Sequence, residues 1–193
     1  MWGIEWWIYQ PATEFRFLMD LLRRRMEAPD FLQWNPDTNQ YSGLIEEWWQ
    51  TSKELGVPFT HLIVEINAAQ RYLVQYQWFK NWCTLRGVQL VSHTTHKNNS
   101  DPEYGLQTVA PQWRFGRIRL PYVVPGRFLS EQLIQEVTTY GSDGTASMTT
   151  DLLMAHWFFE FQLPNLYHGD YVPVRQARPS WVNTQPYRGH YRT

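Results

Sequence analysis

The chain is organised around the stretch His61-Leu62-Ile63-Val64-Glu65-Ile66-Asn67-Ala68-Ala69-Gln70. The apolar and β-branched run at 62–66 predicts a strand that is buried on both faces. Glu65 appears just where this strand is about to end, and an ionised carboxylate is costly to bury without a partner or a metal. Two interpretations stay open. Glu65 either points out of the sheet edge or caps a loop, or it is a metal ligand at the carboxyl end of a central strand, where open α/β sheets keep their sites.

The segments on either side of this strand predict a partly parallel sheet. A long helix with apolar residues at three-and-four spacing is expected over 69–86, with Gly87 as its stop, followed by a short strand at 88–91. Strand, helix and strand over this distance form a βαβ unit. Upstream, the pattern predicts a helix that begins with Ser42 as N-cap and ends at Gly56.

The N-terminal third allows two interpretations. The aromatic run from Trp2 to Tyr9 is typical of a strand and is closed by Gln10-Pro11. Residues 15–26 are rich in Leu, Met and Arg, which favours a helix by propensity. The same residues also alternate between apolar and other types, which allows a strand that pairs with the first in a hairpin. Propensity alone does not decide between them.

The second half carries a polar segment, a group of arginines and a buried helix. The polar segment runs over 92–103, and Ser100 or Asp101 is expected to cap a helix that ends at Gly116. A short strand around Ile118, a helix at 130–138 and a loop over 140–147 follow. The last element is apolar nearly all round and is therefore expected to be buried. The arginines of this half are Arg114, Arg117 and Arg119.

Asp151 is the second candidate site carboxylate, and it lies at the start of the last helix, which is expected to be buried. Its simplest role there is an N-terminal cap, favoured by the helix dipole by about 0.5–1 kcal/mol. A second role, as partner of Glu65, needs further support. His93 and His96 are three residues apart but follow a strand, so they lack the fixed helical face of a zinc pair, and a zinc site is not expected.

Composition limits the class of protein. The 193 residues are most simply one domain, with a formal net charge of −1, so any affinity for a polyanion must come from local basic clusters. Aromatic residues make up 17 % of the chain, with 11 Trp, which is typical of a ligand platform or an interface. One cysteine, Cys83, excludes an internal disulfide. No run reaches the roughly 18 apolar residues of a membrane span, and the N-terminus lacks a signal-peptide pattern, so an intracellular soluble protein without membrane contact is expected.

Three groups of residues now carry a resemblance to a known family. Val64-Glu65-Ile66-Asn67 before a long helix resembles the second acidic motif of the large terminase subunit of tailed double-stranded DNA phages. The run from His93-Thr94-Thr95 to Phe115-Gly116-Arg117-Ile118-Arg119-Leu120-Pro121 is similar to the segment that follows in that family. Thr150-Asp151-Leu152-Leu153-Met154-Ala155 resembles its last motif, an Asp-Asp pair before a Val-Met-Ala helix. The likeness is to the C-terminal nuclease domain, in the style of actinobacterial phages.

This resemblance implies an α/β fold of the RNase H-like type, a mixed sheet flanked by helices, over residues 1–165, with an extended or disordered tail at 166–193. It makes 15–26 a strand paired with Trp2 to Tyr9. It also implies a two-metal endonuclease that holds Mg²⁺ or Mn²⁺ through Glu65 and Asp151, since hard ions prefer oxygen ligands. His93, Lys97, Arg114, Arg117 and Arg119 would line one side of the cleft and contact the DNA backbone.

The departures from the family pattern limit this expectation. The first acidic residue of the family lies on a strand ahead of the hairpin, and this chain begins too late to contain it; Glu5 is the nearest acid. Thr150 replaces one acid of the Asp-Asp pair, and Asn99 stands where a Lys is common, with Lys97 shifted. No phosphate-binding Gly-x-x-x-x-Gly-Lys-Ser/Thr loop is present, so the ATPase motor is absent. The sequence therefore predicts a nuclease domain truncated at its N-terminal side.

Three functions follow as alternatives. The first is the endonuclease domain of a viral packaging terminase that cleaves concatemeric double-stranded DNA during head filling, in the host cytoplasm. Its partners would be double-stranded DNA, the terminase ATPase domain or small subunit, and the portal protein. The second is a catalytically inactive fragment that binds DNA or docks on the motor. The third is an aromatic-rich carbohydrate-binding module, against which the helices and the parallel unit argue.

Overall fold

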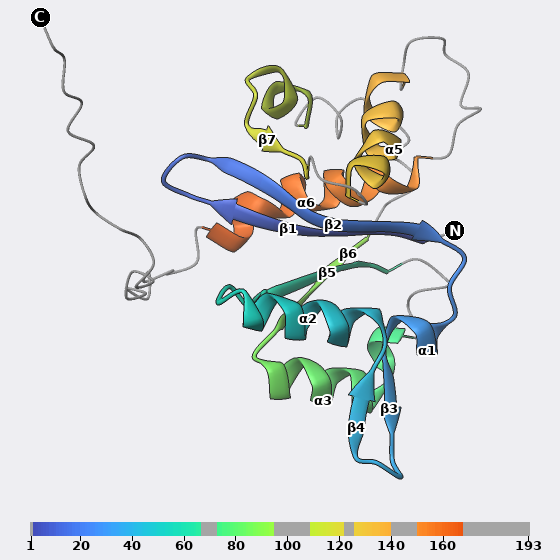
Figure 1. Ribbon diagram of the computed structural model, residues 1–193. Coiled ribbons are helices and arrows are strands. Elements are labelled where there is room, and N and C mark those ends of the chain that lie inside the picture. The colour runs from blue at the N-terminus through green and yellow to red at the C-terminus, as the bar shows by residue number, and fades with distance from the viewer. Residues whose placement is uncertain (1, 67–72, 95–108, 122–125, 140–149, 168–193) are drawn as a thin grey trace, which may run out of the picture.

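The computed structural model describes residues 2–66, 73–94, 109–121, 126–139 and 150–167. Its first two strands, β1 (Trp2–Gln10) and β2 (Phe15–Arg24), form a long antiparallel hairpin (Figure 1). The short strand β7 (Ile118–Arg119) pairs in parallel with β2 and completes a three-stranded sheet. Residues 15–24 are thus a strand despite their helical propensity, because both of their faces are covered by the rest of the fold.

The expected βαβ unit is confirmed, but its helix is shorter than the predicted 69–86, since the chain is extended at Tyr76 and the α-helix begins at Gln77. Strand β5 (His61–Glu65) pairs in parallel with β6 (Gln89–His93), and the connection contains a short 3₁₀ turn (Leu73–Gln75) and helix α3 (Gln77–Arg86). Gly87 ends α3 with a φ of 67°, in the left-handed region that glycine adopts without strain.

One part of the sheet prediction is wrong. The resemblance implies a single mixed sheet, in which the strand at 62–66 would be central and the hairpin of Trp2 to Tyr9 with 15–26 would lie beside it. Among the described residues, β5 pairs with β6 alone, and the strands form three small sheets instead of one. Among the described strands, β1 pairs only with β2 and β5 only with β6, so no backbone hydrogen bonds join the hairpin to the βαβ unit.

The segment between the hairpin and β5 contains elements that the sequence pattern only partly predicts. Helix α1 (Ala28–Phe31) leads into a small hairpin of β3 (Gln33–Asn35) and β4 (Gln40–Ser42), and helix α2 (Leu44–Glu54) follows. The tight turn places Asn39 at a φ of 54°, which asparagine tolerates. Ser42 is not the N-cap of α2. Its backbone belongs to β4, and Gly43 takes the cap position instead.

The C-terminal half supplies helices that cover the hairpin. Residues 109–114 are helical, and helices α5 (Gly126–Thr139) and α6 (Asp151–Tyr167) follow. The predicted burial of α6 is confirmed, since Leu152 and Leu153 are almost completely buried. The helix continues past Pro164 to Tyr167, so the predicted tail boundary at 166 lies inside it. The rest of the tail, the polar segment at 95–108 and the loop at 140–149 lie outside the described residues.

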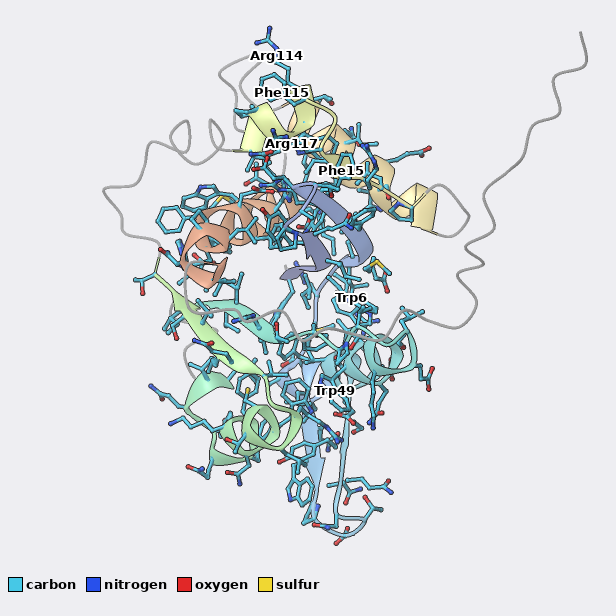
Figure 2. The ribbon with its side chains drawn as sticks, turned by 90° about the vertical axis from the view of Figure 1, so that its left-hand side faces the viewer. Trp6, Phe15, Trp49, Arg114, Phe115 and Arg117 are labelled. Carbon is cyan, nitrogen blue, oxygen red and sulfur yellow. The ribbon has the colours of Figure 1, made fainter. Side chains whose placement is uncertain are left out.

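The hairpin lies between two layers of helices (Figure 1). One face packs against α5 and α6 through Leu18, Leu21, Leu133 and Leu152. The other face packs toward α2 and α3, where the largest core cluster contains Trp6, Trp48, Trp49, Phe79 and Trp82; Trp6 and Trp49 are labelled in Figure 2. The chain is therefore a mixed α/β domain of small sheets flanked by helices. No described helix is long and apolar enough to cross a membrane.

Candidate functional site

Asp151 lies in the first turn of α6, close to the start of β1. Its Oδ2 atom is 3.5 Å from Nε of Arg23. A Cβ atom at Gly3 would lie 2.3 Å from the carbonyl oxygen of Asp151, so β1 and α6 can approach this closely only with glycine at that position. The sheet and the helix together therefore hold the backbone of Asp151 in place.

The N-terminus of α6 is capped by Glu136 of α5, which corrects the expectation that Asp151 is the cap. The Oε2 atom of Glu136 accepts hydrogen bonds from the backbone N–H groups of Leu152 and Leu153, at 3.0 and 2.9 Å. Its Oε1 accepts one from Arg23 at 3.1 Å. Burial raises the pKa of Glu136, and the nearby Asp151 charge raises it further, while Arg23 and the two N–H groups lower it.

Glu5 is a buried carboxyl group on the face of β1 that packs against α6. Its Oε2 accepts a hydrogen bond of 2.7 Å from the Trp7 indole and lies 4.0 Å from Nδ1 of His156. Burial raises the pKa of Glu5 well above its ordinary value, and the Glu136 charge raises it further. Burial lowers the pKa of His156 to about 3, so this histidine is neutral near pH 7.

Glu65, the first predicted metal ligand, is half-buried at the end of β5 and lies opposite His93 in the strand register. The carboxylates of Glu65 and Asp151 suit a hard divalent ion by their chemistry. The described residues hold no group of three His, Cys, Asp or Glu side chains arranged for a metal, which falls short of a two-metal centre. The pairing of Glu65 with Asp151 therefore stays a prediction.

The predicted DNA-binding arginines lie together on one end of the molecule. Arg114 is exposed and precedes Phe115, whose side chain is 72 % exposed; both are labelled in Figure 2, near Arg117 and Phe15. Arg117 forms an ion pair with Glu14, and the Arg119 guanidinium lies 4.0 Å from the centre of the Phe15 ring. We call Arg114, Phe115, Arg117 and Arg119 the arginine patch.

The other two predicted DNA contacts do not belong to this patch. His93 is buried, with its ring 4.5 Å from that of Phe158, and its Nδ1 is hydrogen-bonded to the Gln162 side chain at 3.1 Å. A side chain in this position is not at the surface where a phosphate would bind. Lys97 lies outside the described residues, and its role stays a prediction.

Sequence reasoning missed most of the charged groups that surround α6. Glu160 forms a buried two-pronged ion pair with Arg16, at 2.9 and 3.1 Å, across 144 positions of the chain. No local sequence motif predicts an ion pair between residues so far apart in the chain. The available signal was a charged residue inside an otherwise apolar helix, which must find a partner if the helix is buried.

No protein-family model, curated protein or solved structure matches this chain. The assignment of a function therefore depends on the residues and their geometry.

Proposed function

We propose that the chain is an RNase H-like nuclease domain of a phage DNA-packaging terminase, which cleaves concatemeric double-stranded DNA with Mg²⁺ or Mn²⁺. The observation that carries the proposal is β2 (Phe15–Arg24). Its composition favours a helix, and only the terminase resemblance required a strand paired with the first. The order of hairpin, βαβ unit and a last helix beginning at Asp151 agrees with the same resemblance.

In this proposal Glu65 and Asp151 bind the metal, and the surrounding residues position them. A bound divalent ion would activate water and stabilise the leaving oxygen of the phosphodiester. Glu136 accepts hydrogen bonds from the first turn of α6 and so holds Asp151 in position. The positive charge of Arg23 lies beside the carboxylates of Glu136 and Asp151 and reduces the repulsion between them. Two carboxylates are too few for two ions, so the chain by itself should cleave DNA only weakly.

The arginine patch is the proposed contact with DNA. Arg114 and Arg119 are exposed, and cleavage without sequence preference needs contacts to the phosphate backbone. Affinity for duplex DNA should fall steeply with salt, because phosphate neutralisation releases counterions. Arg114→Ala should lower the slope of log K against log salt by about one. The matched control is Arg24→Ala, which removes a strand-end arginine outside the patch, and an unchanged slope in Arg114→Ala would remove the patch from the proposal.

Plasmid nicking with Mn²⁺ tests the activity. We expect feeble nicking by the chain alone, none by Asp151→Asn, and robust nicking when a strand carrying an aspartate is joined upstream of Trp2. Removing one preorganised stabilising group typically costs about 10² to 10³ in rate, and losing a metal should cost more. Robust cutting by the chain alone would contradict the proposal that its metal site lacks a carboxylate, and Glu5 would then be the candidate for the third acidic ligand.

A second candidate function is a catalytically inactive terminase part that binds DNA or docks on the motor. The small number of carboxylate ligands among the described residues favours it. The same assay separates the two functions, since an inactive part stays inactive in the joined form while it keeps its salt-dependent DNA affinity. The ATPase domain, the small subunit and the portal protein are the partners that the resemblance implies in either case.

A further inference from the structure

An open groove lies between the β3–β4 hairpin and the helices α2 and α3, at the opposite end of the molecule from β7 and α5 (Figure 1). Its volume is about 790 Å³, within the roughly 300–1,000 Å³ of small-molecule sites. We call it the hairpin groove. Its lining includes the rings of Trp34, Tyr41 and Trp78 and the amides of Gln50 and Asn81.

The three aromatic rings of the groove are held in place by the fold. Trp34 and Tyr41 lie opposite each other in the register of β3 and β4, and their ring centroids are 4.6 Å apart. The Tyr41 hydroxyl donates a hydrogen bond of 3.0 Å to the backbone carbonyl of Trp78, which joins the hairpin to α3. All three residues are half-buried, so part of each remains at the surface of the groove.

Exposed amide side chains line the same groove. Asn81 lies three residues after Trp78 on α3, so the two share one face of that helix. On α2, Gln50 donates a hydrogen bond of 2.7 Å from Nε2 to Oε1 of Glu46. An amide has two N–H donors and a carbonyl acceptor, so one such bond leaves it further capacity. Gln50 and Asn81 can therefore both donate to a ligand and accept from it.

The charged groups of the described lining neutralise each other. Glu46 and Arg86 form an ion pair of 2.6 Å, and the Arg86 guanidinium also lies 4.6 Å from the centre of the Trp49 ring. Single-stranded nucleic acid binds where aromatic rings are combined with an excess of positive charge, which tracks the phosphates. The balanced charge of the hairpin groove therefore favours an uncharged ligand.

We propose that the hairpin groove binds a neutral saccharide. A pyranose ring presents C–H groups on its face, which pack on an aromatic ring, and hydroxyl groups that both donate and accept hydrogen bonds. Trp34 and Trp78 supply the aromatic surface, and the amides of Gln50 and Asn81 supply the matching donors and acceptors. This inference goes beyond the proposed nuclease function and does not depend on it.

A saccharide fits the lining better than an extended proline-rich peptide, the other ligand that binds in aromatic grooves. The main chain of such a peptide offers carbonyl acceptors but few donors, because proline has no N–H group. It would use the N–H groups of the amides and leave their carbonyl oxygens without donors. Sugar hydroxyls satisfy both.

Isothermal titration calorimetry of the full chain tests the site, with maltohexaose, cellohexaose and chitohexaose as probes. We expect at least one of them to bind with a Kd of about 1 mM or tighter. Trp34→Ala should weaken this binding by about tenfold or more, while Trp34→Phe keeps a ring and should retain most of it.

A second variant avoids any effect on the packing of the hairpin. Gln50→Ala removes an exposed amide of α2 and should weaken binding several-fold. The matched control is Gln132→Ala, which removes an exposed glutamine of α5 outside the groove and should leave binding unchanged. Circular dichroism checks that each variant is folded, and Gln50→Ala decides if Trp34→Ala is not.

Three results would overturn the inference. The first is the absence of binding by all three saccharides. The second is binding that Gln50→Ala leaves as strong as in the control. The third is tighter binding of hexaproline or of hexathymidylate than of any saccharide, weakened by the same variants, because the groove would then belong to a peptide or to a nucleic acid.

Discussion

The two faces of the β1–β2 hairpin differ in the kind of side chain that they bury. Toward α2 and α3 the core is aromatic, with Trp6, Phe79 and Trp82 buried, and its main ion pair joins Glu46 to Arg86 at the edge. Toward α6 the hairpin buries charged and titratable groups. Arg16 pairs with Glu160 and Arg23 with Glu136, while Glu5 lies 4.0 Å from the neutral His156.

We infer that the aromatic face mainly stabilises the fold, while the face toward α6 positions the residues of the candidate site. Burial of aromatic surface is favourable at any pH and needs little geometric precision. A buried charge is tolerated only with a partner in good geometry, so each pair on the α6 face fixes one helix against one strand. Asp151, the predicted metal ligand, lies on the face that is fixed by charged pairs, beside Arg23 and Glu136.

The largest expected effect comes from breaking the buried ion pair. Glu160→Ala leaves the Arg16 guanidinium, on a residue that is 6 % exposed, without its carboxylate. We expect a loss of about 3–5 kcal/mol in the free energy of unfolding, measured with urea. The double variant Arg16→Met with Glu160→Leu should lie within about 1 kcal/mol of the unmodified chain, because no buried charge remains. A double variant as unstable as Glu160→Ala would show that packing, and not the unpaired charge, sets the cost.

On the aromatic face, Trp82→Phe should cost less, about 2–3 kcal/mol. Trp82 is fully buried, and its Nε1 donates a hydrogen bond of 2.6 Å to Oε2 of Glu46. The variant removes this bond to a charged acceptor and leaves a small cavity. The loss should be nearly the same at pH 6 and pH 8. The control Trp78→Phe changes a half-buried ring and should cost about 1 kcal/mol or less; equal losses would contradict the role of the buried bond.

The third prediction concerns pH and has the smallest effect. The pKa of Glu5 is raised above its ordinary 4.5, so the folded chain holds that proton more tightly and stability falls as pH rises from about 4.5 through the folded pKa. Glu5→Gln cannot ionise and keeps the acceptor for Trp7. The variant should match the unmodified chain in its free energy of unfolding near pH 4 and be more stable than it at pH 8, because only the unmodified chain then has to bury an ionised carboxyl group or keep it protonated.

Two features make this comparison specific to Glu5. The pKa of His156 is lowered to about 3, so its contribution is present above pH 6.5 and is lost as pH falls from 6.5 toward 3, in both proteins alike. Glu54→Gln, at an exposed position, is the control and should change nothing with pH. Thermal unfolding between pH 4 and pH 8 measures the difference, and parallel curves for Glu5→Gln and the unmodified chain would contradict the burial of an ionisable Glu5.

Local patterns were sufficient for part of the fold. The βαβ unit of β5, α3 and β6 and the helix stop at Gly87 follow from hydrophobic period and glycine chemistry. The strands β3 and β4 have three residues each, which is too short to show a hydrophobic period. For β2, propensity and alternation pointed to different structures, and tertiary contacts on both faces decided for the strand.

The charged groups around the candidate site were less accessible to sequence reasoning. Glu136 caps α6 from another helix, and its role depends on contacts that no spacing rule describes. Glu5 is followed directly by Trp6 and Trp7 on β1, so the burial of its carboxyl group depends on which face of the strand α6 covers. Since α6 comes more than 140 residues later, the pattern around Glu5 alone could not indicate a buried carboxyl group.

Mn²⁺ binding to the full chain, followed by electron paramagnetic resonance, tests the central claim that Glu65 and Asp151 share a metal. We expect one weakly bound ion near neutral pH, lost in Glu65→Gln and equally lost in Asp151→Asn, because each removes one of two carboxylate ligands. Glu54→Gln should bind as the unmodified chain does. Binding that survives both Glu65→Gln and Asp151→Asn would contradict the shared site.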